Sequence, residues 1–164
     1  METVINREAF LRALESARVG LAVREIVEQS TCFVFSDGDV ITYNDVTSVR
    51  GPSGLPKQFV GAVQAGELVE VLRRIEDDNV SVSSDGEWLV VGVKGTLAEC
   101  ALEADIRLPL KNIERPGKFT KLHQDFSEAI KLVHKCAGKD ESQWKLTCVH
   151  ITSDFIEAND DQHA

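Results

Sequence analysis

The chain has 164 residues, of which 43% are hydrophobic, so it can bury one good core, although its length lies between the usual sizes of one domain and of two. Lys and Arg total 18 against 27 for Asp and Glu, and the resulting net charge of −9 argues against a uniformly basic nucleic-acid binder. The first ten residues lack the apolar core of a signal peptide, and no apolar run approaches the roughly 18 residues that a membrane span needs. We therefore expect a cytoplasmic protein without a membrane partner.

The first predicted element is a helix over residues 6–21, which Asn6 is placed to cap. Its apolar residues follow the i, i+3, i+4, i+7 spacing of one helical face: Phe10, Ala13, Leu14 and Ala17. Residues 30–35 and 39–43 read as two strands around a turn at Gly38, which tolerates positive φ. The sequence thus predicts a helix followed by a β-hairpin.

Residues 51–58 are predicted as a loop because they are rich in Gly and Pro. A short strand over 59–63 and a second helix over 65–78 follow, and the helix has Leu68, Val71, Leu72 and Ile75 on one face. Three further strands are predicted, over 79–84, 87–95 and 97–110. Helices segregated from a mainly antiparallel sheet indicate an α+β fold.

The segment around Pro116 and Gly117 breaks this pattern, and the pattern then begins again. A second apolar stripe lies 116 positions beyond the first: Phe126, Ala129, Ile130 and Val133. Thr147 and Cys148 likewise lie 116 positions beyond Thr31 and Cys32. Asn159 and Asp160 follow Asn44 and Asp45 at 115, as if the second hairpin loop were one residue shorter. We therefore predict a complete domain over 1–116 and the first part of a second, truncated repeat over 117–164.

Several stretches of the repeat resemble those of one known family. "REAFLRAL" is similar to its first helix, "GDVITYNDV" to a strand that ends in a small-Thr-Asp signature, and "IEANDD" in the second copy to Glu-Ala-Thr-Asp-Gly. The long stretch from Phe59 to Val91 resembles its helix, acidic turn and Asp-Gly hairpin. The family is that of the bacterial and phage DNA sliding clamps, the β subunit of DNA polymerase III.

This resemblance implies the DNA-clamp fold, with helices packed on one face of mainly antiparallel sheets. It implies a processivity factor for DNA replication, in which six such domains form a ring around duplex DNA, with helices lining the hole. The expected partners are double-stranded DNA without sequence preference, a DNA polymerase, a clamp loader and, in the intact protein, further copies in a homo-oligomeric ring. The peptide-binding pocket of the family lies mainly beyond residue 164, so no pocket residue is assigned.

A clamp needs positive charge on the helix faces that are turned away from the sheet, since those faces meet the phosphates. Lys131 and Lys135 lie four residues apart, opposite the apolar stripe of their helix, and Arg12 and Arg73 occupy the matching faces of the first two helices. Arg24, in the link after the first helix, matches the family's basic loop near DNA. These five residues are the candidate DNA contacts. Four acidic residues share the same faces: Glu8, Glu15, Glu70 and Glu128. These faces could therefore be ordinary solvated helix surfaces with i, i+4 charge pairs, which is the alternative to DNA contacts.

The four cysteines show no C-x-x-C spacing and are expected to be reduced, packed thiols: Cys32, Cys100, Cys136 and Cys148. A zinc site from Cys136, Cys148, His134 and His150 fits no short ligand pattern well. An acidic cluster could bind a cation or act as a carboxylate pair, but it reads better as a loop and strand end: Asp154, Glu157, Asp160 and Asp161. No phosphate-cradling Gly loop and no nucleophile set is present. We expect no enzyme and no cofactor.

Two other functions remain open at this point. An acidic interaction module, such as a DNA mimic or a clamp decoy acting on replication proteins, is favoured by charge, since residues 1–116 carry 12 basic and 19 acidic side chains. A small metal-dependent enzyme is the other. Basic residues gathered on the two-helix face would favour the clamp, and acidic residues spaced like phosphates would favour the mimic.

Overall fold

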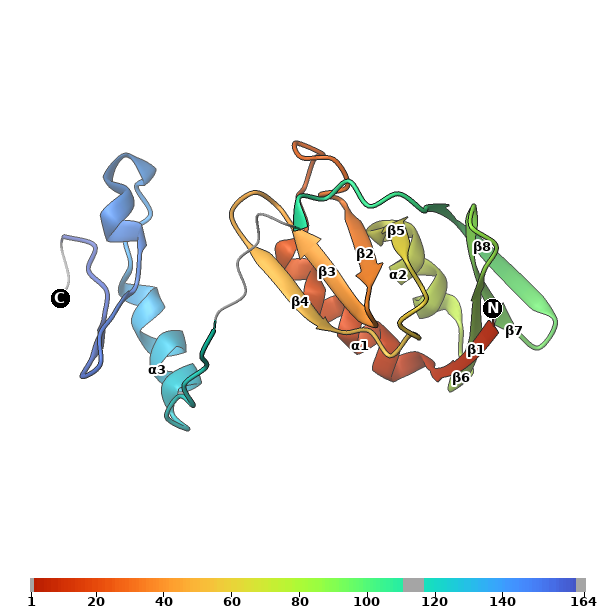
Figure 1. Ribbon diagram of the computed structural model, residues 1–164. Helices are drawn as coiled ribbons and strands as arrows, with labels where there is room; N and C mark the ends of the chain where they lie inside the picture. The colour runs from red at the N-terminus through yellow and green to blue at the C-terminus, as the bar shows by residue number, and fades with distance from the viewer. Residues whose placement is uncertain (1, 111–116, 162–164) are drawn as a thin grey trace. The chain divides into compact units, whose positions relative to one another are not determined.

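The computed structural model describes residues 2–110 and 117–161, and the chain divides into two compact units, Met1–Glu114 and Arg115–Ala164 (Figure 1). The first unit contains, in chain order, β1 (Glu2–Asn6), α1 (Arg7–Ala17), the 3₁₀ turn η1 (Arg18–Gly20), β2 (Cys32–Ser36), β3 (Asp39–Tyr43), β4 (Ser48–Pro52), β5 (Gly61–Gln64), α2 (Ala65–Arg74), β6 (Asn79–Ser84), β7 (Trp88–Val93) and β8 (Thr96–Glu103). The second unit contains α3 (Phe126–Val133), η3 (His134–Cys136), η4 (Glu141–Thr147), β9 (His150–Ile151) and β10 (Ile156–Glu157).

The first unit is built on one eight-stranded sheet, in the order β1-β6-β7-β8-β5-β2-β3-β4. Every neighbouring pair is antiparallel. The sheet is strongly curled, and α1 and α2 lie together on its inner face (Figure 1). The predicted α+β class, with helices on one face of a mainly antiparallel sheet, is confirmed.

The helix α1 and the hairpin after it form where the sequence predicts, but both helices are shorter than predicted. α1 ends at Ala17 instead of residue 21, and α2 ends at Arg74 instead of residue 78, so that Ile75 has an extended backbone outside the helix. Asn6 caps α1 by accepting a hydrogen bond from the Ala9 amide at 2.9 Å. Between β2 and β3, Asp37 and Gly38 both have positive φ, at 57° and 83°, which is the geometry of a tight two-residue hairpin turn.

The main core of the first unit lies between the sheet and its two helices. Phe10 and Leu14 of α1, with Leu68 and Leu72 of α2, are fully buried against the strands. Phe35 of β2 lies at the centre, with ring centroids 6.2 Å from Phe10 and 5.5 Å from Phe59. The 3.6-residue spacing of the apolar residues therefore decides which helix faces point inward and which point to solvent.

Two strands were absent from the prediction. β1 and β4 are the edges of the sheet, and each pairs with a single neighbour. β4 ends in Gly51 and Pro52, which the sequence pattern had assigned to a loop. An edge strand tolerates Pro because one side of its backbone needs no partner, so composition alone hides such a strand.

The strand predicted over 97–110 is also too long, because β8 ends at Glu103. The residues that follow, 104–109, form no helix or strand and lie on the face of the sheet opposite the helices. There Leu108 is buried, and Ile106 and Leu110 pack with it against Cys32 and Val34. The alternating apolar pattern of this segment thus reflects packing onto a face of the sheet and not pairing at its edge.

The second unit has the predicted helix but little sheet. The stripe residues of α3 are half-buried, and no described residue of this unit is fully buried. Its strands β9 and β10 contribute two residues each. The expectation that Cys148 is a packed thiol is wrong: β9 begins at His150, and Cys148 is exposed after η4, where its Sγ lies 3.4 Å from the carbonyl of Trp144.

Backbone features of the two units nevertheless match at an offset of 116 residues. The 3₁₀ turns η1 and η3 coincide at this offset. Three backbone hydrogen bonds recur in the same register: Leu21 to Arg18 and Ala137 to His134, Ala22 to Ser30 and Gly138 to Leu146, and Cys32 to Gln29 and Cys148 to Lys145. The link after the helix is therefore closed in the same way in both units.

The hairpin keeps the same offset on both of its strands. Val34 pairs with Ile41, and His150 pairs with Glu157, 116 residues later on each side. The expectation of a hairpin loop one residue shorter in the second unit is therefore wrong. The offset is still 116 after the hairpin, where Asp45 and Asp161 both have positive φ. Asn159-Asp160 therefore lies one position before the structural equivalents of Asn44-Asp45, which are Asp160 and Asp161.

Candidate nucleic-acid interface

The outer surfaces of α1 and α2 form the helical face of the first unit. Because Phe10, Leu14 and Ala17 point into the core, the intervening positions of α1 face solvent. Arg12 is among them, and it is exposed. Within residues 2–110 and 117–161, neither Arg12 nor Arg24 forms an ion pair with a carboxylate.

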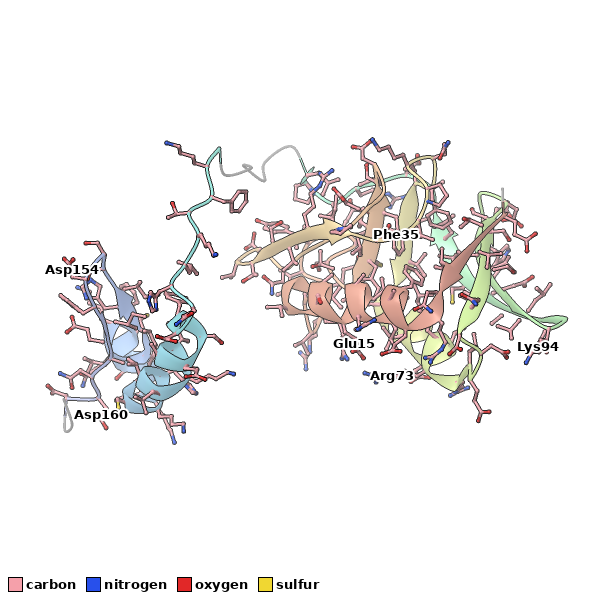
Figure 2. All side chains as sticks on the ribbon, turned by 90° about the horizontal axis from the view of Figure 1, so that it is seen from below. Glu15, Phe35, Arg73, Lys94, Asp154 and Asp160 are labelled. Atoms are coloured by element: carbon pink, nitrogen blue, oxygen red, sulfur yellow. The ribbon has the colours of Figure 1, made fainter. Side chains whose placement is uncertain are left out.

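Arg73 also lies on the outer face, but its charge is shared. Its guanidinium forms an ion pair with Glu15 of α1 at 2.7 Å, with side chains 53% and 40% exposed. Figure 2 shows Glu15 and Arg73 on the side of the helices that is turned away from the sheet. Such half-exposed pairs contribute roughly 0–1 kcal/mol to stability. The pair therefore matters more for the charge of this face, where Glu15 offsets Arg73, than for the stability of the unit.

The two helices carry balanced charge on a strongly acidic chain. Together α1 and α2 hold four basic and four acidic residues: Arg7, Arg12, Arg73 and Arg74 against Glu8, Glu15, Glu67 and Glu70. The acidic excess of the first unit therefore lies outside these helices. Arg74 pairs with Glu70 at 3.3 Å in the i, i+4 arrangement expected of an ordinary solvated helix surface. The helical face is thus less repulsive to phosphates than the chain as a whole.

Lys131 and Lys135 belong to the second unit, and both are exposed. Only Lys131 lies on α3, because this helix ends at Val133 and Lys135 falls in the 3₁₀ turn η3. The expectation that both project from one α-helical face is therefore wrong, since a 3₁₀ turn has three residues per turn instead of 3.6. Both side chains remain open to solvent on the surface of their own unit.

Arg24 lies in the loop of residues 21–31, between η1 and β2. The tip of this loop is highly exposed, with Val23 at 100% and Ile26 at 82%. Its base is tied down by Gln29, a residue that sequence reasoning missed. Gln29 is buried to 2% exposure and hydrogen-bonds to residues 74–79 positions away, so no local pattern announced its role.

The cysteines divide between the two units. Cys32 and Cys100 are buried, and burial raises the pKa of the Cys32 thiol to about 11 and raises that of Cys100 as well. Cys136 and Cys148 are exposed, so the expectation of four packed thiols is wrong for these two, which have too little sheet around them to bury a side chain. In the part of the chain that the structure describes, no three His, Cys, Asp or Glu residues are grouped to hold a metal ion.

No helix among the described residues is long and apolar enough to cross a membrane. No family model matches the sequence, and no curated protein matches it either. Solved structures do match, and they define the class: the fold is that of the DNA sliding clamps, the β subunits of DNA polymerase III.

Three of these structures show the extent of the likeness. The sliding clamp of Bartonella birtlesii, solved bound to griselimycin, is 17% identical with a TM-score of 0.69 and covers 98% of this chain. The β subunit of Streptococcus pyogenes is 18% identical with a TM-score of 0.66 over 94%, and that of Thermotoga maritima is 15% identical with 0.65 over 90%. The chain covers 47%, 44% and 42% of these proteins, so it spans less than half of their length.

Proposed function

We propose that this chain is part of a DNA sliding clamp, a non-catalytic processivity factor that encircles duplex DNA and tethers replication proteins to it. The observation that carries the proposal is the clamp fold itself, which one alignment extends over 98% of the chain and hence over both units. Such a protein acts by topology: because a closed ring cannot dissociate from the duplex that it encircles, weak phosphate contacts are sufficient, and weak contacts allow it to slide. Its place of work would be the cytoplasm, and its partners a DNA polymerase, a clamp loader and further copies in the ring.

We further propose that residues 1–116 form one clamp domain and that residues 117–164 begin a second copy. Three backbone hydrogen bonds, the 3₁₀ turn and the hairpin pairing recur at 116 residues, which supports a duplication. One pair of positions also shows a complementary change of side-chain size in this register. In the first unit the small Gly20 packs on the larger Thr42, whereas the equivalent positions of the second unit hold the larger Cys136 and the smaller Ala158.

The DNA contacts of the proposal are Arg12, Arg24, Arg73, Lys131 and Lys135. Arg12 and Arg24 are favoured in the first unit, since they are exposed and form no ion pair among the described residues. Arg73 contributes less free charge because Glu15 accepts its hydrogen bond. Lys131 and Lys135 contribute the corresponding charge of the second unit.

Duplex DNA binding at low salt tests the proposal, measured by fluorescence anisotropy across a salt series. We expect Arg12→Glu with Arg24→Glu, and separately Lys131→Glu with Lys135→Glu, to weaken binding. The slope of log affinity against log salt should fall by about one for each phosphate that is no longer neutralised. Lys57→Glu changes an exposed charge away from the helices and serves as the control. A loss of DNA affinity in Lys57→Glu as large as the losses in the two double variants would contradict the proposal.

An acidic interaction module is the second candidate. It is favoured by the net charge of −9 and by the two ion pairs that occupy Arg73 and Arg74 on the helical face. A module of this kind would bind a replication protein and leave DNA alone. If the wild-type chain shows no salt-dependent DNA binding but binds a clamp loader or polymerase, this second function becomes the better account.

A further inference from the structure

The loop that carries Arg24 is closed on itself near its base. The Ala22 amide donates to the Ser30 carbonyl at 2.8 Å, and the Ser30 amide donates to the Val27 carbonyl at 3.0 Å. The Glu25 carboxylate accepts from the Gln29 amide at 2.6 Å. These bonds fix the shape of the loop, but they do not attach it to the rest of the unit.

The loop is attached at its C-terminal end by Thr31, whose carbonyl accepts from the Ala65 amide, and on its side by the 3.6 Å ion pair between Glu28 and Arg107. Its largest set of hydrogen bonds to the rest of the unit is made by the side chain of Gln29. Its Nε2 donates to the Glu103 carboxylate and to the Asp105 carbonyl, each at 2.8 Å. Its Oε1 accepts from the amides of Arg107 and Leu108, at 2.8 and 3.2 Å. A Gln side chain offers two donors and one oxygen with two lone pairs, so all four of its hydrogen-bonding positions are used.

The backbone of Gln29 indicates that this side chain is required. Its φ is 62°, in the left-handed region that Gly adopts without cost and that other side chains disfavour. A residue kept there in spite of its Cβ is held by its surroundings. Gly would suit this backbone better, but it could not form the four hydrogen bonds to residues 103–108.

The second unit offers a natural comparison. Lys145 lies 116 residues beyond Gln29 and is exposed, and its side chain has no amide group that could form the hydrogen bonds of Gln29. The loop there keeps two of the same backbone hydrogen bonds, from Gly138 to Leu146 and from Cys148 to Lys145. These two hydrogen bonds therefore form without a glutamine, although Lys145 lies in η4 and lacks the positive φ of Gln29. The bonds of the Gln29 side chain to residues 103–108 are thus additional to those that close the loop.

We propose that Gln29 is a positioning residue for the Arg24 loop: its amide ties the base of the loop to residues 103–108 and so holds the Arg24 guanidinium toward duplex DNA. This inference rests on the proposed function. The Arg24 side chain belongs to an exposed tip, and such a tip would move freely on a loop attached only at its two ends. Holding it in place lowers the ordering cost of each phosphate contact.

The test combines variants of Gln29 and Arg24 in the full chain, with short duplex DNA as the probe at low salt. Gln29→Gly removes the side chain and suits the left-handed backbone, and Gln29→Leu is a second variant that keeps the volume. Arg24→Ala should weaken DNA binding about threefold, as expected for one phosphate contact, and Gln29→Gly should weaken it by up to the same factor. The double variant should bind no more weakly than Arg24→Ala alone.

Arg107→Ala is the matched control. It removes the 3.6 Å ion pair between Arg107 and Glu28 but keeps the backbone amide that donates to Gln29. We expect wild-type affinity for this control, and lower NMR order parameters for residues 22–28 in Gln29→Gly only. Wild-type affinity in Gln29→Gly, a loss that adds in full to that of Arg24→Ala, or an equal loss in Arg107→Ala would each overturn the inference.

Failure of the proposed function gives a different result. If wild-type protein does not bind the duplex, or Arg24→Ala binds as well as wild type, Arg24 is no DNA contact and the positioning role falls with it. The order parameters would still report whether Gln29 immobilises the loop. The two failures are therefore distinguished by the Arg24→Ala measurement.

Discussion

The two units of this chain have closely similar backbone features and very different burial. From the 3₁₀ turn after the helix to the hairpin, the second unit repeats three backbone hydrogen bonds and the strand pairing of the first at 116 residues. In the first unit the helix stripe is buried on an eight-stranded sheet, whereas in the second it is half-buried beside a two-stranded ribbon. These local hydrogen bonds thus form without a core, although α3 lacks the side-chain cap that Asn6 gives α1. The core is what supplies most of the stability.

The largest expected difference concerns one pair of equivalent core positions. Leu14 is fully buried, and its register partner Ile130 is half-buried. Leu14→Ala should destabilise the first unit by about 2–5 kcal/mol, because it leaves a cavity, and Ile130→Ala should cost the second unit about 1 kcal/mol or less. Native-state hydrogen exchange reads each unit separately. Equal losses would mean that the second unit is as well packed as the first.

Thiol reactivity gives the next largest contrast. Cys32 is buried and its pKa is raised to about 11 from an ordinary 9.0, so near pH 8 its thiolate is about a hundredfold scarcer. Cys148, its register partner, is exposed and should label rapidly with a maleimide or a disulfide reagent. Mass spectrometry of native protein after brief labelling measures both. Rapid labelling of Cys32 in the folded state would show that β2 does not face the segment that covers it.

The sign of the pH effect follows from the same burial. Because folding raises the pKa of Cys32, the folded state holds the thiol proton more tightly than the unfolded chain does. The stabilising contribution is complete below pH 9 and declines as the pH rises toward 11. Cys32→Ala should remove this part of the alkaline sensitivity of the first unit, which urea unfolding across that pH range would measure.

A smaller effect is expected where the units differ in side-chain size. A Cβ on Gly20 would collide with the Thr42 hydroxyl, which donates to the Ala17 carbonyl at 2.6 Å. Gly20→Ala should therefore cost about 1–3 kcal/mol by overpacking. Adding Thr42→Ala recreates the smaller partner found at Ala158 and should recover part of that loss, since contacting residues are not additive. Full additivity in thermal or urea unfolding would show that the Thr42 hydroxyl is not what excludes a side chain at position 20.

The sequence was sufficient for the elements whose signals are local. The apolar period located α1 and α2, although each ends four residues before its predicted end, and Asp37-Gly38 specified the β2–β3 turn. The edge strands β1 and β4 were missed because each needs a single partner and tolerates Gly, Pro and polar residues. In the candidate interface, the exposure of Arg12 was predictable from the helix period. The Arg73–Glu15 pair and the Gln29 bonds were not, since they join residues 58 and 74–79 positions apart.

One surface is central to the proposed function: the helical face with the Arg24 loop, meeting DNA in both copies of the repeat. An NMR titration of the ¹⁵N-labelled chain with short duplex DNA at low salt tests this most directly. We expect amide shifts at the exposed positions of α1 and α2, at the Arg24 loop, and at α3 and η3 in the second unit, with the outer strands unaffected. Shifts confined to the sheet, or no salt-sensitive shifts at all, would contradict the clamp assignment and favour the acidic module.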